Sequence, residues 1–199
     1  IYLDAYAEVP GRGLEQPPPD FGERVSMAYG GGMETLVGHR SVATPGAFAG
    51  LGEAVAGYGS VAWPEVMAPA IAATRNGFPL SSTAAAYLTY AHEPIFDTCP
   101  ESRRALHRSD GTPLMEGDPV VIEGLAEALE TIASEGPEAF YTGSIGRAMA
   151  EDMAANGGRL SFSKSQAGSC GPDTPARPFM HSESPLCWKI STTRSAAPR

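Results

Sequence analysis

Apolar side chains that recur every three or four residues are the feature that most constrains the fold of this chain. They run from Pro45 to Asn156, and this spacing places them on one face of an α-helix, whereas a strand would need strict alternation. The clearest stripe consists of Ile122, Leu125, Leu129 and Ile132. We therefore predict a mainly helical body over these residues.

Proline, serine and glycine mark where the individual helices begin and end. Pro64 suits the first turn of a helix, and Gly59 suits a C-terminal cap. Residues 1–44 lack such a pattern, so we predict that they are irregular after a short extended start, with Gly30-Gly31-Gly32 forming a flexible or tightly turned segment. The predicted helices run from Pro45 to Tyr58, from Pro64 to Asn76, from Ser81 or Ser82 through Leu88, from Glu101 to Arg108, from Val120 to Ser134 and from Ser144 to Ala155.

The charge of the chain argues against two classes of partner. Its 199 residues carry a formal net charge of −9, whereas a surface that binds nucleic acid or an anionic membrane needs clustered Lys and Arg. The tightest basic cluster, Arg103, Arg104 and Arg108, suits a solvated helix face. Every apolar stretch is broken well before the roughly 20 residues that a bilayer span requires. We expect neither nucleic acid nor membrane as a partner, and the sequence predicts no particular compartment.

Amino-acid usage changes near residue 162. Residues 1–162 contain nine Arg, no Lys and 21 acidic residues, which gives −12. Residues 163–199 contain both lysines, three Arg and two acidic residues, which gives +3, and they show neither helical nor strand periodicity. We therefore divide the chain into a domain at 1–162 and a tail at 163–199. The tail is either a disordered polar extension or an out-of-frame or truncated product.

The residue types that commonly carry catalysis do not form a motif here. Gly30-Gly31-Gly32 has neither the dinucleotide nor the P-loop spacing, and neither Ser60 nor Ser144 lies in a Gly-x-Ser-x-Gly elbow. The histidines and cysteines have no zinc-site spacing. They are His39, His92, His107, His181, Cys99, Cys170 and Cys187. From the residues alone we predict no metal site, no cofactor and no catalytic group.

Four segments together resemble the large subunit of the γ-glutamyltranspeptidase family. They are SVATPGAFAGL (Ser41–Leu51), YGSVAWPEVMAPAIAATRNGFPLS (Tyr58–Ser81), LMEGDPVVIEGLAEALETIASEGPEAFYTGSIG (Leu114–Gly146) and MAANGGRLSF (Met153–Phe162). Their order and spacing also match, so the resemblance spans about residues 1–162. It implies a mostly α fragment, which is the large-subunit part of an α+β (αββα) N-terminal-nucleophile hydrolase fold, cut short at both ends.

The reaction that this resemblance implies is acyl transfer from a γ-glutamyl amide, such as glutathione, to water or an amino acid. In the family the hydroxyl of an N-terminal threonine attacks the amide, its own α-amine acts as the base, and backbone N–H groups stabilise the oxyanion. These groups belong to the small subunit. We therefore expect a small catalytic subunit and a small-molecule amide as partners, and no catalytic residue in this chain. Thr192-Thr193 lies in the tail, and we do not assign it the role of nucleophile.

One departure from the family pattern bears on the substrate. The family typically has an Asp-x-Arg-Glu-x-x-Pro stretch whose Arg binds the α-carboxylate of the glutamyl group, and the matching stretch here is Asp4–Pro10. Tyr6 stands in place of that Arg, and Ala7 in place of the Glu. A phenol cannot make the bidentate charged pair that a guanidinium makes with a carboxylate. Tyr6 is thus our one candidate substrate-binding residue, with a packing role as the alternative.

Three functional hypotheses remain open at this point. The first is a fragment of a γ-glutamyltranspeptidase-like hydrolase in which residues 1–162 form scaffold and one wall of the substrate cleft. The second keeps the fold but takes a non-glutamyl amide, as cephalosporin acylases do, and Tyr6 favours it. The third is a non-catalytic binding or scaffold chain. After residue 162 the family's usual acidic stretch is replaced by SKSQAGS (Ser163–Ser169), at the point where the composition also changes.

Overall fold

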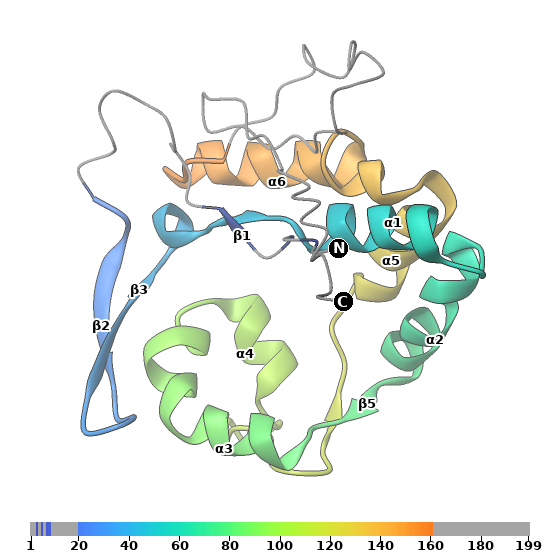
Figure 1. Cartoon of the computed structure of the whole chain (residues 1–199). Coiled ribbons are helices and arrows are strands. Elements are labelled where there is room, and N and C mark those ends of the chain that lie inside the picture. The colour runs from blue at the N-terminus through green and yellow to red at the C-terminus, as the bar shows by residue number, and fades with distance from the viewer. Residues whose placement is uncertain (1–2, 4, 6, 9–19, 161–199) are drawn as a thin grey trace, which may run out of the picture.

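The computed structural model describes Leu3, Ala5, residues 7–8 and residues 20–160, and these fold mainly into helices (Figure 1). This confirms the predicted helical body. The helices are α1 (Ala47–Tyr58), α2 (Trp63–Asn76), α3 (Ser82–Ala91), α4 (Pro100–Leu106), α5 (Leu125–Glu135) and α6 (Ser144–Ala155). Shorter turns are the 3-10 helices η1 (His39–Ser41) and η3 (Pro137–Phe140) and the π-helix η2 (His92–Phe96). The predicted tail, 163–199, lies outside the described residues, as does Tyr6.

Several predicted helix ends agree with the structure because local capping chemistry sets them. Ser81 is the N-cap of α3, where its hydroxyl accepts a hydrogen bond from the Ala84 N–H at 3.2 Å. Pro64 lies in the first turn of α2, and Gly77, with a φ of 75°, follows its last residue. Gly59 caps α1 by donating its N–H to the Val55 carbonyl at 2.8 Å. Local sequence therefore defines these boundaries without help from tertiary packing.

The helix predicted from Val120 begins five residues later, at Leu125. Val120 instead belongs to the strand β6 (Pro119–Val120), which pairs antiparallel with β5 (Phe78–Pro79). Gly124 then adopts a left-handed conformation with a φ of 76°, and α5 follows it. Ile122 is consequently 41% exposed and is not part of the buried stripe, whereas Ile132 is 2% exposed. A long-range strand pairing overrode the local helical spacing.

The prediction that the chain is irregular up to residue 44 is wrong for residues 23–37. Strands β2 (Glu23–Met27) and β3 (Met33–Val37) form an antiparallel hairpin with Glu23 opposite Val37 and Met27 opposite Met33. Its turn contains the three consecutive glycines, whose φ values of 61°, 92° and 108° suit glycine alone, and Gly32 donates its N–H to the Tyr29 carbonyl at 3.0 Å. The glycine run is therefore tightly turned, as one of the two alternatives predicted.

The helical body consists of α1, α2, α5, η3 and α6, with α2 packed along α5 (Figure 1). Its core is built around Met67 of α2 and Ile132 of α5, and the rings of Phe48 and Phe140 pack against each other with centroids 4.8 Å apart and planes inclined at 47°. The Trp63 indole donates to the Ile132 carbonyl at 2.9 Å, and the buried Tyr141 hydroxyl accepts the Ala49 N–H at 3.0 Å. The same apolar spacing that predicted the helices thus supplies their contact faces.

A second, smaller unit contains α3, η2 and α4, and we call residues 78–120 the lobe. Its own core consists of Leu80, Leu88, Leu114 and Val120. Strands β5 and β6 form a ribbon at the base of the lobe, where the chain enters from and returns to the helical body. Figure 1 shows the β2–β3 hairpin reaching toward the lobe from the other side. The chain is therefore organised as a helical body with a separately packed lobe.

Candidate functional site

The segment that the resemblance assigns to substrate binding is anchored to the start of the helical body. Strand β1 (Ala7–Glu8) pairs antiparallel with β4 (Thr44–Pro45), which leads directly into α1. A Cβ added at Gly50 of α1 would collide with the Ala5 side chain, so the glycine allows this close approach. Both neighbours of position 6 are therefore placed beside α1, whereas Tyr6 itself lies outside the described residues.

Thr44, beside this segment, is a buried polar residue. It is 4% exposed, and its hydroxyl has no hydrogen-bond partner among the described residues. A buried polar atom of this kind normally pairs, because leaving it unpaired costs about 1–3 kcal/mol. Ala7, in contrast, is exposed, in the position where the family pattern would place a Glu. The first candidate site thus combines an exposed strand position with an unpaired buried hydroxyl next to it.

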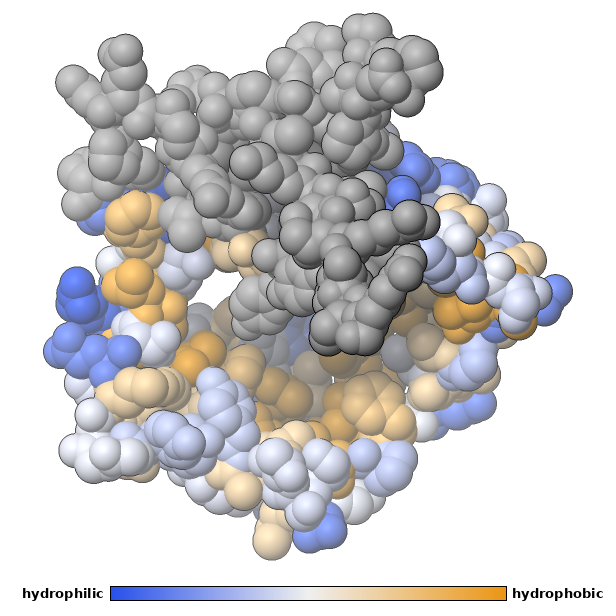
Figure 2. Space-filling view, viewed as in Figure 1, coloured by the Kyte–Doolittle hydropathy of each residue, from blue (hydrophilic) through white to orange (hydrophobic). Residues whose placement is uncertain are grey.

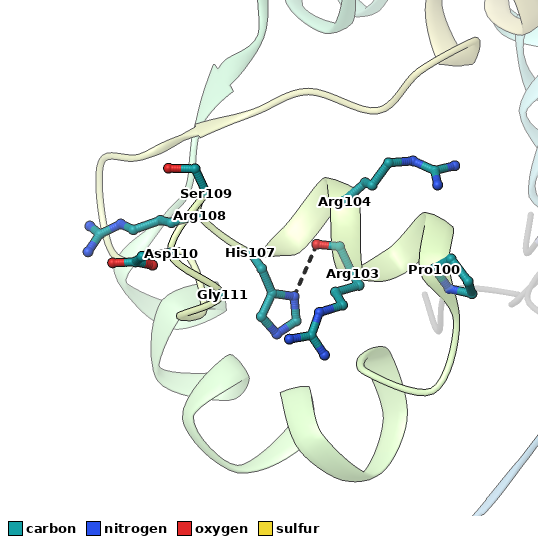
Figure 3. Close-up of a pocket in the computed structure, with 8 residues that line it drawn as sticks. All are labelled: Pro100, Arg103, Arg104, His107, Arg108, Ser109, Asp110 and Gly111. Atoms are coloured by element: carbon teal, nitrogen blue, oxygen red, sulfur yellow. Dashed lines mark hydrogen bonds between the residues drawn. The ribbon is translucent and has the colours of Figure 1, made fainter.

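A second candidate is an open depression of about 720 Å³ at the end of α4, lined by Arg103, Arg104, His107 and Arg108 among others (Figure 3). Each of its guanidinium groups is already paired. Arg103 pairs with Asp97, Arg104 with Glu101 at 3.3 Å, and Arg108 with Asp118 at 2.6 Å. The hydrogen bond from the Met115 N–H is the main cause that holds the pKa of Asp118 below its usual value, and the Arg108 guanidinium contributes further in the same direction. This pairing supports the predicted solvated helix face.

The described histidines lie near other polar side chains but do not gather at one point. His92 and His107 face each other at 5.7 Å between ring centroids, and His39 lies 3.2 Å from the Asp152 carboxylate. Within residues 20–160 and the few described before them, no group of three or more His, Cys, Asp or Glu could hold a metal ion.

In the same part of the chain, no helix has both the length and the apolar character needed to cross a membrane.

Large apolar side chains are exposed on several elements. One set lies on α1, α2 and the turn between them, and it consists of Leu51, Tyr58, Val61 and Val66, which are 44–63% exposed. A second set surrounds the ribbon and consists of Phe78, Met115, Val121 and Ile122. Figure 2 shows apolar surface around the hollow between the lobe and the helical body. Exposed apolar groups in such number are typical of a surface that another polypeptide covers.

Comparison with known proteins relates this arrangement to one class of enzymes. Gamma-glutamyltranspeptidase of Helicobacter pylori superposes with a TM-score of 0.64 at 25% identity over 80% of this chain and 44% of that chain. Cephalosporin acylase from Bacillus halodurans shares the fold, with a TM-score of 0.55 at 23% identity over 80% of this chain and 29% of that one. The described residues therefore have the mainly helical part of an N-terminal-nucleophile hydrolase fold, as predicted.

The family follows from sequence. The model of the gamma-glutamyltranspeptidase family matches residues 24–163. The glutathione hydrolase proenzyme of Escherichia coli is 36% identical over 128 residues, and the acylase ACY 1 proenzyme of Pseudomonas sp. (strain V22) is 38% identical over 132 residues, each over 64% of this chain. The chain belongs to the gamma-glutamyltranspeptidase family. It spans about a fifth of the length of these two relatives, 22% in each case.

Sequence reasoning missed the hairpin and the tyrosines near its turn. Tyr29 in the turn contacts Tyr90 of α3 at 5.1 Å between ring centroids, and Tyr87 contacts Tyr90 at the same distance. The signal was present, because two short runs flank a glycine-rich turn, which is typical of a hairpin. The partner tyrosines could not be found in this way, since they lie some 60 residues further along the chain.

Proposed function

We propose that residues 1–162 form the scaffold and one wall of the substrate cleft of a γ-glutamyltranspeptidase-like hydrolase, and that a second, smaller subunit supplies its nucleophile. The observation that carries this proposal is the family match over residues 24–163. The names of both curated relatives mark them as proenzymes. The exposed apolar side chains on α1 and α2 are the kind of surface that such a second subunit would cover.

The substrate is proposed as an amide, with two candidate acyl groups. A γ-glutamyl amide is the first, because the family model and the glutathione hydrolase relative favour it. An acyl group without an α-carboxylate is the second, because the resemblance of Asp4–Pro10 to the family pattern would place Tyr6 at the carboxylate-binding Arg. The similarity to an acylase at 38% identity supports this second candidate. Loss of a charge-assisted bidentate contact costs about 2–4 kcal/mol, which corresponds to roughly 30-fold to nearly 1,000-fold in specificity constant.

A chimera tests both parts of the proposal. The matching segment of the Escherichia coli glutathione hydrolase proenzyme would be replaced by residues 1–162 of this chain, and self-cleavage would be followed on denaturing gels. Hydrolysis would be measured on a γ-glutamyl anilide and on an acyl anilide that lacks the α-carboxylate. We expect a self-cleaving chimera that prefers the second substrate, and a Tyr6→Arg variant that gains roughly 30-fold to nearly 1,000-fold on the first.

The controls separate scaffold from specificity. Tyr2→Arg introduces a guanidinium into the same segment, four positions away, and we expect it to change neither substrate preference nor self-cleavage. A chimera that folds but does not cleave itself would contradict the scaffold role. A self-cleaving chimera in which Tyr6→Arg gives no gain on the γ-glutamyl anilide would contradict the substrate argument alone.

A further inference from the structure

The lobe and the helical body are packed as separate units. The body has the core around Met67 and Ile132 and a second one of Tyr141, Met153 and Leu160. The core of the lobe, built on Leu80, Leu88, Leu114 and Val120, shares no residue with either. The covalent connection between the units is the β5–β6 ribbon, which is only two residue pairs long, Phe78 with Val120 and Pro79 with Pro119. Units joined by a short ribbon without a shared apolar core are expected to move relative to one another.

The two chain segments that run between the ribbon and the helical body each contain a glycine with a positive φ, which suits a hinge. Gly77 precedes β5 with a φ of 75°, and Gly124 follows β6 with a φ of 76°. A Cβ at Gly77 would lie 3.1 Å from the Val121 side chain, so the chain enters the lobe at Gly77 and leaves it at Val121 at adjacent points. Hinges are typically a few residues at the ends of elements that absorb changes in φ and ψ. Rotation at these two neighbouring points would carry the lobe as one piece.

The hairpin makes the second connection between the units. Along β2 the burial increases from the exposed Glu23 to Met27, which is 3% exposed, whereas the turn that follows and Met33 opposite Met27 are exposed. Two residues after Met27, the ring of Tyr29 packs against the ring of Tyr90 in the lobe. The ring centroids are 5.1 Å apart and the planes are inclined at 31°. Strand β2 also contacts η2 of the lobe. The hairpin thus reaches from the body to the lobe and ends on its tyrosines.

The opposite end of the hairpin is fixed to the helical body. After β3, His39 of η1 contacts the Asp152 carboxylate of α6 at 3.2 Å. Before β2, the Asp20 carboxylate pairs with Arg40, and the Asp20 carbonyl accepts a hydrogen bond from Arg159. Arg159 also lies over the Phe21 ring, 5.9 Å from its centroid. These contacts keep the base of the hairpin with the body when the lobe moves.

We propose that the β2–β3 hairpin is a strap that holds the lobe against the body, with Tyr29 as its latch on Tyr90 and the glycine-flanked ribbon as the hinge. The latch is releasable because it is exposed. Tyr29 is 52% exposed and Tyr87 is 39% exposed, and the hydrogen bonds of the described residues include none from the hydroxyls of these three tyrosines. Release requires the separation of these rings and of the contact between β2 and η2, which would expose Met27, whereas separating the ribbon would break backbone pairing.

Spin-label distances in the full chain test the strap. Cys99, Cys170 and Cys187 would be replaced by Ser, and labels attached to cysteines introduced at Ser60 in the body and Ser109 in the lobe, both of which are exposed. With Tyr29→Ala we expect the distance distribution to broaden and to gain a more distant population. Tyr29→Phe keeps the ring and should leave the distribution unchanged. Tyr58→Ala removes another exposed tyrosine, 63% exposed on α1, and is the matched control.

A second label pair keeps local unfolding distinct from rotation. Labels at Ser82 and Ser109 lie within the lobe, and we expect their distance to stay narrow in every variant. An unchanged Ser60–Ser109 distribution in the Tyr29→Ala variant would overturn the strap. Broadening of the pair within the lobe would overturn it as well, because Tyr29 would then support the fold of the lobe rather than its position.

Discussion

The indole nitrogen of Trp63 donates a hydrogen bond to the backbone carbonyl of Ile132 across 2.9 Å, which joins the first turn of α2 to the last turns of α5. The same carbonyl also accepts the Gly136 N–H at 3.0 Å. We expect Trp63→Phe to lower the free energy of unfolding by about 1–3 kcal/mol, because it removes the donor and part of the packed ring. Urea denaturation measures this, with the exposed Val61→Ala as control. Equal midpoints for the two variants would show that the bond contributes nothing.

Replacing a large side chain by Ala on the buried face of α5 should reduce stability far more than the same replacement just before the helix. Ile132 is 2% exposed within the core of the body, so Ile132→Ala is expected to destabilise the fold by about 2–5 kcal/mol. Ile122, which is 41% exposed, is the matched control, and its replacement by Ala should change stability by no more than about 0.5 kcal/mol. Thermal unfolding of both variants distinguishes them. Similar losses would contradict the observed start of α5 at Leu125.

The N-cap of α3 offers a test of local capping. Ser81 accepts the Ala84 N–H at 3.2 Å, and Ser81→Ala should cost about 0.5–2 kcal/mol because that donor loses its partner. Ser82 is the first residue of the helix, and Ser82→Ala should have little effect or stabilise slightly, since alanine has the higher helix propensity. Chemical denaturation of the two variants, side by side, decides whether position 81 is the cap.

The carboxylate of Asp118 should make the lobe sensitive to acid. Asp118 accepts a hydrogen bond from the Met115 N–H at 2.7 Å, and this is the main cause that lowers its pKa below the ordinary value of 3.8. The ion pair with Arg108 lowers this pKa further. Its contribution to stability is therefore complete above pH 3.8 and is lost as the pH falls through the lowered folded value. We expect Asp118→Asn to be less stable than wild type at neutral pH and to lose less on acidification. Glu116→Gln is the control for a single lost charge, and melting curves that run parallel for all three proteins would exclude the effect.

The chain purified alone should not act on γ-glutamyl substrates. An N-terminal-nucleophile hydrolase needs a nucleophilic side chain on the residue that carries its free α-amine, and we propose that this residue belongs to the smaller subunit. Incubation with a chromogenic γ-glutamyl anilide, with and without an acceptor dipeptide, should give the rate of the blank, beside an intact family member as positive control. Turnover that survives repurification and disappears on denaturation would place a catalytic group within these residues.

Sequence reasoning recovered those parts of the fold that local chemistry determines. The helices α1, α2, α3 and α6 follow from apolar spacing and from caps such as Ser81 and Gly59, which act within a turn or two of the chain. The start of α5 was misplaced, because pairing of Val120 with Phe78 joins residues far apart in sequence and competes with helix formation. For the candidate site, the sequence predicted Tyr6 through a family resemblance, and this stays a prediction because Tyr6 lies outside the described residues, whereas the unpaired Thr44 hydroxyl and the Tyr29–Tyr90 contact depend on tertiary packing.

The lobe enters and leaves the helical body at adjacent points, since Gly77 and Val121 lie side by side. In topology the lobe is an insertion between α2 and α5, which pack closely against each other. If the lobe were unfolded, bringing these two helices together would close a long flexible loop, which has an entropic cost. If the lobe collapses first around Leu88 and Leu114, it closes that loop before the two helices meet. Such a module could be shortened or exchanged between related proteins without changing how α2 packs on α5.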